Sequence, residues 1–152
     1  LAERMWVIGP PARHGKSGKP RAGFRIGDLG ELPLILPNMA HANRRLVENA
    51  AVEHGVRLRI KIEADSVAFV KALVANGLGY TILTYAAVQD EVQRKALTIY
   101  PIVRPTLSTR VTIVTLRDKQ LPKTTRDASA LLHEVCRALV RSGQWAGAQL
   151  SR

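Results

Sequence analysis

The sequence VRLRIKIEADSVAFVKALVANGLGYTILTY, residues 56–85, decides the fold because its hydrophobic period changes twice. From Val56 to Glu63 apolar and charged residues alternate, which is typical of a strand with one buried face. After Asp65 and Ser66, both good N-cap residues, apolar side chains recur at helical spacing until an Asn-Gly pair ends the pattern. A β-branched and aromatic run follows.

We therefore predict a strand over 56–62, a helix that begins after Ser66, and a strand over 80–84. This order is that of a parallel crossover unit. The turn over 63–66 then lies at the carboxyl end of a strand, where open α/β sheets bind ligands.

Length and composition indicate one globular domain. The chain has 152 residues, of which 46% are hydrophobic and 23% charged, enough to bury about two-thirds of its unfolded surface. Its one cysteine, Cys136, excludes an internal disulfide framework and favours a reducing cytoplasm. No apolar run approaches the roughly 18 residues of a membrane span, and the first residues do not read as a signal peptide.

The net charge of +11 suggests nucleic acid as a partner, but its distribution argues against that interpretation. Residues 31–100 carry 8 basic and 7 acidic side chains, so the excess lies nearer the two ends. Neither a dense basic run nor an interleaved aromatic series of the kind that stacks bases is present. A solvated basic surface and an anion-attracting role both remain open.

Upstream of the crossover unit, the run Pro33–Leu36 (PLIL) is continuously apolar, as expected of a strand buried on both faces. A helix over 42–54 follows, with Leu46, Val47, Ala50 and Ala51 facing inward and Arg44, Arg45, Glu48 and Glu53 facing outward. Only residues 38–41 join that strand to this helix. The free N–H groups of the helix would then point at the sheet edge that carries Asp65 and Ser66.

The remaining segments complete an α/β order. We predict a strand over 5–8, a tight turn over 28–31, a short helix over 86–95 and a strand near 97–102. A half-buried strand over 110–116, a polar turn over 117–120 and a helix over 124–142 follow. Thr124 and Asp127 have capping-box spacing, and the helix carries an apolar stripe. Residues 144–152 read as a frayed tail.

Several motifs resemble catalytic or metal sites without meeting their requirements. Gly9 and Gly15-Lys16-Ser17 are separated by five residues, whereas a P-loop needs four, and two prolines remove N–H groups that such a loop uses. The four histidines lack metal-ligand spacing, so we predict no metal or cofactor. His41, Asp65 and Ser66 include the atoms of a catalytic triad, but Ser66 is not on a nucleophile elbow. Cys136 is interpreted as a packing residue.

At this point a family resemblance is visible. It rests on the opening ERMWVIGPP, on LPLILPNMAHANRRLVENAAVEHGV, on EADSVAFVKALVANGLGYTILTYAAV, on LTIYPI and on RVTIVTLRDKQLPKTTRDASALLHEV. Their order and spacing, over about residues 1–142, resemble the effector-binding domain of LysR-type bacterial transcriptional regulators.

The resemblance implies an α/β fold like the type 2 periplasmic binding proteins, with two lobes and a small effector between them. Residues 1–104 would form the second lobe with a mostly parallel sheet. Residues 105–143 would return a last strand and helix to the first lobe, and 144–152 would be a tail. The winged helix-turn-helix of the family and the first part of lobe one are absent from these 152 residues. We therefore expect the C-terminal part of a longer protein, whose last helix needs the missing lobe or a partner chain.

The resemblance also implies site residues, which are Asn38, Met39 and His41 from the first turn and Asp65, Ser66 and Val67 from the second. His41 could equally be a surface residue, Asp65 and Ser66 are helix caps in any case, and Arg44 or Arg45 could be solvated rather than bind a carboxylate. The expected ligand is a small organic anion, because a helix N-terminus and a basic surface favour one.

As a regulator, the protein would be cytoplasmic, without enzymatic activity and without membrane contact. It would form a homodimer or tetramer through this domain and contact DNA only through its absent N-terminal part. Two alternatives stay open. A solute-binding protein of a transporter is disfavoured by the single cysteine and the absent secretion signal. A small α/β enzyme is disfavoured because no convincing nucleophile-base pair is present.

Overall fold

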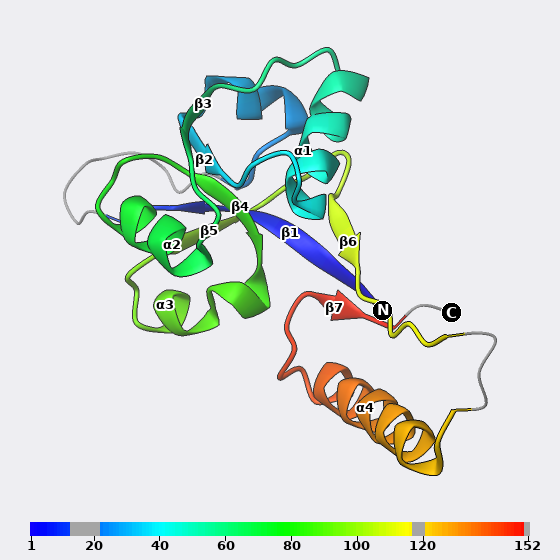
Figure 1. Ribbon diagram of the computed structural model, residues 1–152. Coiled ribbons are helices and arrows are strands. Elements are labelled where there is room, and N and C mark those ends of the chain that lie inside the picture. The colour runs from blue at the N-terminus through cyan, green and yellow to red at the C-terminus, as the bar shows by residue number, and fades with distance from the viewer. Residues whose placement is uncertain (13–21, 117–120, 151–152) are drawn as a thin grey trace. The chain divides into compact units, whose positions relative to one another are not determined.

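A computed structural model describes residues 1–12, 22–116 and 121–150 (Figure 1). The chain forms two units, a larger unit of Arg4–Thr109 and a smaller unit of Leu1–Glu3 with Arg110–Arg152. The phosphate-loop-like segment and the expected polar turn over 117–120 fall largely outside the described residues.

The strands are β1 (Ala2–Gly9), β2 (Leu34–Leu36), β3 (Ile60–Glu63), β4 (Thr81–Thr84), β5 (Thr98–Pro101), β6 (Ser108–Arg110) and β7 (Ala148–Gln149). The helices are η1 (Ile26–Glu31), α1 (Ala42–Glu53), α2 (Val67–Ala75), η2 (Tyr85–Ala87), α3 (Gln89–Gln93) and α4 (Lys123–Arg141).

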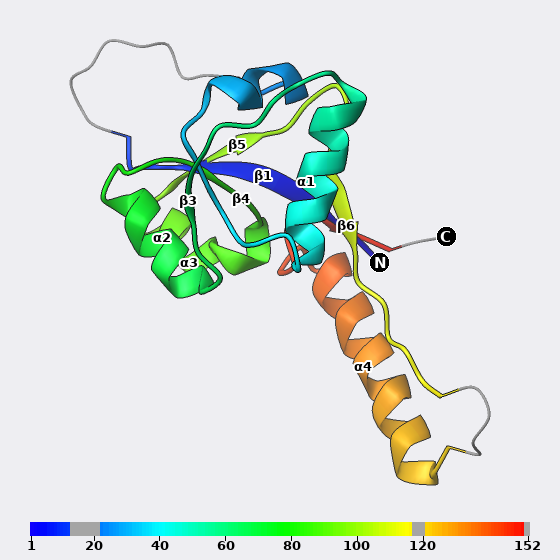
Figure 2. The same cartoon turned by 45° about the horizontal axis from the view of Figure 1, so that its top comes forward.

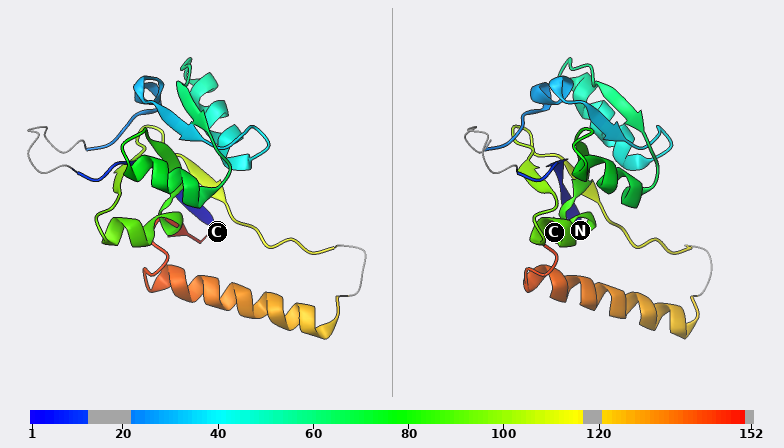
Figure 3. Two further views of the ribbon diagram at one scale, coloured as in Figure 1. Left: turned by 60° about the vertical axis from the view of Figure 1, so that its left-hand side comes forward. Right: turned by 90° about the vertical axis from the view of Figure 1, so that its left-hand side faces the viewer.

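The strand β2 is central to the larger unit, as PLIL predicts. On one side it pairs in parallel with β3, with Ile35 opposite Ile62. On the other side it meets Tyr80, the residue before β4. The Tyr80 N–H donates to the Pro33 carbonyl oxygen over 2.9 Å, and the Ile35 N–H donates to the Tyr80 carbonyl oxygen over 2.7 Å. The predicted crossover from β3 through α2 to β4 is therefore confirmed (Figure 3).

Both faces of this sheet are covered, which explains the continuous apolar runs. In Figure 2, α1 lies on one side of the strands, whereas α2 and α3 lie on the other. Side chains alternate between two core clusters to match. Leu34, Leu36 and Ile82 pack with Val47 of α1, whereas Ile35 and Leu83 pack with Val70 and Val74 of α2. All three residues of β2 are at most 1% exposed.

The strand directions need one correction. Parallel pairing holds for β3, β2 and Tyr80, but β1 is antiparallel to β4, β5 and β7. The α/β class is unaffected. The correction concerns only the direction of β1, which runs opposite to β4 and β5. The alternation over 56–63 is also confirmed as alternating burial, although only Ile60–Glu63 has strand geometry.

The predicted strand over 110–116 is wrong. Only Ser108–Arg110 forms β6, and residues 111–116 are irregular, with Val114 84% exposed. The Val111 N–H donates to the Leu1 carbonyl oxygen over 2.9 Å, and no described strand pairs with the residues that follow. An alternating sequence forms a strand only where a neighbour accepts its hydrogen bonds.

Three local predictions also need correction. The expected turn over 28–31 is the end of the 3-10 helix η1. The N-cap of α4 is Pro122, without a side-chain hydrogen bond, so Thr124 and Asp127 form no capping box. The segment read as a frayed tail contains β7, which pairs with β1, and the indole N–H of Trp145 donates to the buried Glu3 carboxylate over 3.1 Å.

Gly79 makes the approach of Tyr80 to β2 possible, because a Cβ at this position would collide with the Pro33 carbonyl oxygen and the Ile35 side chain. We predict that Gly79→Ala lowers the free energy of unfolding by about 1–3 kcal/mol, the usual cost of overpacking. Urea denaturation measures it. Gly27→Ala is the matched control, since nothing lies within 4 Å of its Cβ position. Equal stabilities of the two variants would contradict this close approach.

Candidate functional site

The turns that follow β2 and β3 meet at one rim of the larger unit, as the sequence predicts. The Asp65 carboxylate joins them. Its Oδ1 accepts the Asn38 backbone N–H over 3.0 Å, and its Oδ2 accepts the Asn38 side-chain amide over 2.7 Å. The His41 Nε2 lies 3.3 Å from Asp65 Oδ1, with both side chains about half exposed. One carboxylate therefore fixes the spacing of the two turns.

These hydrogen bonds shift the acidity of Asp65. The hydrogen bond from the Asn38 backbone N–H lowers the pKa of the Asp65 carboxyl below its ordinary value of 3.8. Desolvation opposes this change, while the Asn38 side chain and the His41 charge add to it. The ionised form of Asp65 is thus the form that the rim stabilises.

The N-terminus of α1 opens onto the same rim and is uncapped. Its N-cap residue, His41, makes no side-chain cap hydrogen bond, and the first helical bond is from the Arg45 N–H to the His41 carbonyl oxygen over 3.2 Å. The N–H groups of Ala42, Asn43 and Arg44 have no acceptor within the described residues. Three donors at the positive end of a helix dipole form a potential anion site.

Arg44 corrects the expectation of an outward, solvated side chain, because it is only 7% exposed. Its guanidinium donates through Nε to Glu48 over 2.9 Å and through Nη1 to the Pro37 carbonyl oxygen over 2.9 Å. The Glu63 carboxylate lies 3.5 Å away. Arg44 therefore ties α1 to the ends of β2 and β3, with its charge compensated. Arg45 is exposed, as expected, and its guanidinium donates to backbone carbonyl oxygens of the turn between β2 and α1.

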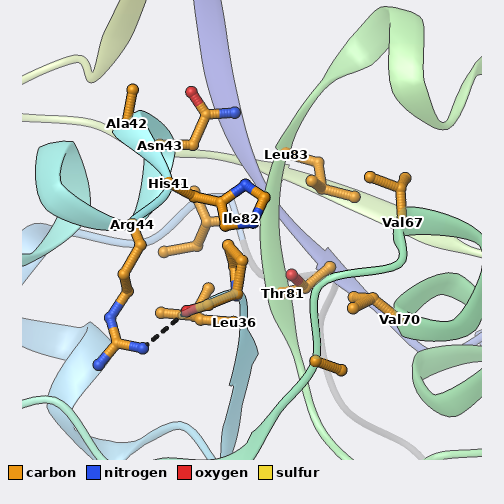
Figure 4. A pocket seen from close by; sticks show the side chains of 12 residues that line it. Leu36, His41, Ala42, Asn43, Arg44, Val67, Val70, Thr81, Ile82 and Leu83 are labelled. Atoms are coloured by element: carbon orange, nitrogen blue, oxygen red, sulfur yellow. Dashed lines mark hydrogen bonds between the residues drawn. The ribbon is translucent and has the colours of Figure 1, made fainter. Parts of the chain in front are cut away.

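A cavity of about 290 Å³ lies between the start of α1, the first turns of α2 and the strand β4 (Figure 4). Most of its lining is aliphatic, and the polar contributions come from the α1 start and from one strand residue. The lining residues are Leu36, Pro37, His41, Ala42, Asn43, Arg44, Ala64, Val67, Val70, Thr81, Ile82 and Leu83. Its size and mixed lining suit a small molecule.

Of the six residues predicted for the site, His41 and Val67 line the cavity. Asn38 and Asp65 form the rim that holds the turns together, and Ser66 Oγ accepts the Phe69 N–H over 3.4 Å as the predicted N-cap. Met39 is 51% exposed beside them. Sequence reasoning missed Thr81, whose only signal is a polar residue inside an apolar strand, and the buried role of Arg44.

Within residues 1–12, 22–116 and 121–150, no group of three or more His, Cys, Asp or Glu side chains could hold a metal ion. Within the same ranges, no helix has the length and hydrophobicity to cross a membrane.

Asp65→Asn tests the rim through its pH dependence. A carboxyl with a lowered folded pKa stabilises the folded state above its unfolded pKa of about 4, and that contribution is lost as the pH falls through the folded value. We expect the melting temperature of the variant to lie below that of the wild type near pH 7, and this gap to narrow as the pH falls below about 4.

Asp90→Asn is the control, since it removes the same charge from a side chain without hydrogen bonds or ion pairs among the described residues. Circular dichroism melts at several pH values measure both variants. A gap for Asp65→Asn that stays constant down to about pH 2 would contradict the assigned role of the ionised carboxylate.

The chain matches the LysR substrate binding domain family over residues 1–137. The HTH-type transcriptional regulator BbuR of Bordetella bronchiseptica is 31% identical over 147 residues, which cover 97% of this chain and 44% of BbuR. This chain thus spans less than half of the length of that curated relative.

Two solved structures share the fold. The regulatory domain of CcmR from Synechocystis PCC6803, in complex with 2-PG, superposes with a TM-score of 0.70 at 26% identity, covering 89% of this chain and 64% of that one. A mutant of OxyR from Corynebacterium glutamicum reaches 0.73 at 20% identity, covering 100% of this chain and 47% of that one. The family match and the relation to BbuR establish that this chain belongs to the LysR substrate-binding domain family, the effector-binding part of LysR-type transcriptional regulators.

Proposed function

We propose that this domain senses a small organic anion, which binds in the cavity with its anionic group on the N-terminus of α1. The single observation that carries this proposal is that Ala42, Asn43 and Arg44, whose N–H groups have no acceptor among the described residues, all line the cavity. The half-exposed His41 ring stands beside them. The aliphatic remainder of the lining suits the body of the ligand.

The surrounding charges favour the helix terminus over a side chain as the anion contact. Arg44 is already compensated by Glu48 and Glu63, so its guanidinium is not free to pair with a ligand. Asp65 is already engaged, since its carboxylate accepts two hydrogen bonds from Asn38 and lies 3.3 Å from the His41 ring. An anion at a helix N-terminus gains about 0.3–1 kcal/mol at an exposed site and up to about 2 kcal/mol when partly buried.

We assign the rim residues Asn38, Met39, Asp65 and Ser66 to the entrance, with His41 and Val67 inside it. Met39 and Val67 are apolar side chains exposed by 51% and 46%, which suits a role in covering a bound ligand. Asp65 would keep the entrance shaped through Asn38 instead of contacting the anion, since two negative groups would repel one another.

In the whole protein, we propose that ligand binding shifts the arrangement of this domain and of a DNA-binding segment outside these 152 residues. The support is the relation to BbuR, whose name includes a helix-turn-helix. A tenfold shift in a conformational equilibrium needs a ligand that binds one state more strongly by about 1.4 kcal/mol. Such a protein binds its ligand without transforming it, and it works in the cytoplasm beside the DNA.

We also propose that residues 1–104 form the second lobe of the effector domain and that residues 105–143 belong with the first lobe. The apolar stripe of α4 supports association with further protein, as a homodimer or tetramer. Leu131, Leu132 and Val135 are exposed by 60%, 53% and 45%. At about 1.5–3 kcal/mol for each side chain of this size, covering the stripe would stabilise an assembly substantially.

Ala42→Pro tests the anion site without disturbing the helix. Ala42 is the first residue of α1, where proline is tolerated, and His41 already has the extended backbone that precedes proline, with φ −77° and ψ 131°. The variant lacks one of the free N–H groups. We expect an unchanged melting temperature, weaker binding of butyrate and benzoate, and no effect on their uncharged amides.

Calorimetric titration of the wild type, Ala42→Pro and the control Ala42→Gly, which keeps the N–H, measures these affinities. Wild-type protein that binds butyramide and benzamide as well as the corresponding acids would contradict an anion site, as would equal carboxylate affinities in all three proteins.

Leu131→Lys with Val135→Lys tests the stripe. We expect this pair to convert an oligomer into a monomer in light scattering coupled to gel filtration, because two charges replace apolar side chains one helical turn apart. The control pair, Ala130→Lys with His133→Lys, adds the same number of lysines to α4 outside the stripe and leaves the assembly intact. A wild-type monomer that binds no apolar dye would refute the proposed association.

A further inference from the structure

Thr81 carries a polar atom that the fold leaves unsatisfied. Its side chain lies in β4, is 1% exposed, and its Oγ1 has no hydrogen-bond partner among the described residues. Thr81 also belongs to the cavity lining, and Figure 4 shows it among the other lining side chains. A hydroxyl that is removed from water without a partner is a net cost to folding, so its position needs another explanation.

Packing alone does not require a hydroxyl here. The neighbours of Thr81 in β4 are Ile82 and Leu83, both buried, and its partner across the strand pair is Ile8, which is fully buried. Valine has the same shape as threonine and would fill such a position without an unpaired oxygen. The hydroxyl therefore gives the free protein nothing that a methyl group would not.

A ligand in the cavity could supply the missing partner of the Thr81 hydroxyl. The other polar lining residues of the cavity, His41, Asn43 and Arg44, come from the α1 start, where the N–H groups of Ala42 and Asn43 have no acceptor among the described residues. Thr81 adds a polar group from a different element, β4, and aliphatic side chains such as Leu36 and Val70 make up much of the remaining lining. A ligand with two polar ends could use both elements.

We propose that the Thr81 hydroxyl determines the specificity of the effector site, selecting organic acids that carry a hydroxyl group in addition to the anionic group. This inference rests on the proposed function, since the anionic group is the one placed on α1. A ligand hydroxyl suits Thr81 because each of the two can donate or accept. In another staggered χ1 rotamer the Thr81 hydroxyl takes the place that its methyl group holds now, while the methyl group moves to the place of the Cβ hydrogen, and a bound ligand engages the oxygen in such a rotamer.

The first test needs no ligand. Thr81→Val replaces the unpaired hydroxyl with a methyl group, so we expect a melting temperature about 2–4 °C higher than that of the wild type. Thr84→Val, in the same strand but outside the cavity lining, is the control and should show no such gain. A melting temperature lowered by Thr81→Val would overturn the inference, because the hydroxyl would then have a partner.

The second test compares matched acids. Butyrate and the hydroxybutyrates, and benzoate and the hydroxybenzoates, are titrated into the 152-residue protein while the amide signals of Ala42 and Asn43 are followed by NMR. We expect at least one hydroxylated acid to bind about tenfold more tightly than its parent acid in the wild type and in Thr81→Ser. In Thr81→Val that ratio should fall to about one.

The outcomes separate this inference from the proposal on which it rests. If parent and hydroxylated acids bind equally to the wild type, or if the preference survives in Thr81→Val, the role of Thr81 is wrong while the anion site stands. If no acid in either series shifts the amide signals of the α1 start, the anion site itself is refuted, and the Thr81 inference with it.

Discussion

Two backbone hydrogen bonds, from Tyr80 to Pro33 and from Ile35 to Tyr80, hold the arrangement on which the candidate site depends. They place the start of β4 beside Pro33 and Ile35, and the absence of a side chain at Gly79 leaves room for them. With β3 on its other side, β2 is enclosed and its three residues are almost completely buried. The turns after β2 and β3 must then emerge next to one another, since parallel neighbours end at the same edge.

The chemistry of the site at that edge depends on which of its polar groups already have partners in the protein. Asp65 is used to join the two turns, and Arg44 is used to anchor α1, so neither charge is free. In the described cavity lining, backbone N–H groups at the helix start lack acceptors, and Thr81 carries the buried side-chain polar atom that has no partner. A ligand that satisfies both would recover interactions that the free protein lacks.

Sequence reasoning succeeds here where a local pattern determines the outcome. Continuous apolar residues predict a strand buried on both faces, and Ser66 predicts a cap, without knowledge of any partner. It fails where the outcome depends on distant residues. Arg44 is buried because Pro37 and Glu63 lie near it, and residues 111–116 lack strand geometry because no described strand accepts their hydrogen bonds. In the sequence, Thr81 resembles an ordinary strand residue. The three elements that form its neighbourhood come together only in the folded chain.

The most direct measurement of the central claim is the scalar coupling across hydrogen bonds in labelled protein, which identifies donor and acceptor residues individually. The account predicts couplings from the Ile35 amide to the Tyr80 carbonyl, from the Tyr80 amide to the Pro33 carbonyl and from the Ala64 amide to the Leu36 carbonyl. Coupling of the Ile35 amide to any other carbonyl would contradict the place of β4 beside β2. Coupling of the Ala64 amide to a carbonyl other than that of Leu36 would contradict the shared edge of the turns at Asn38 and Asp65.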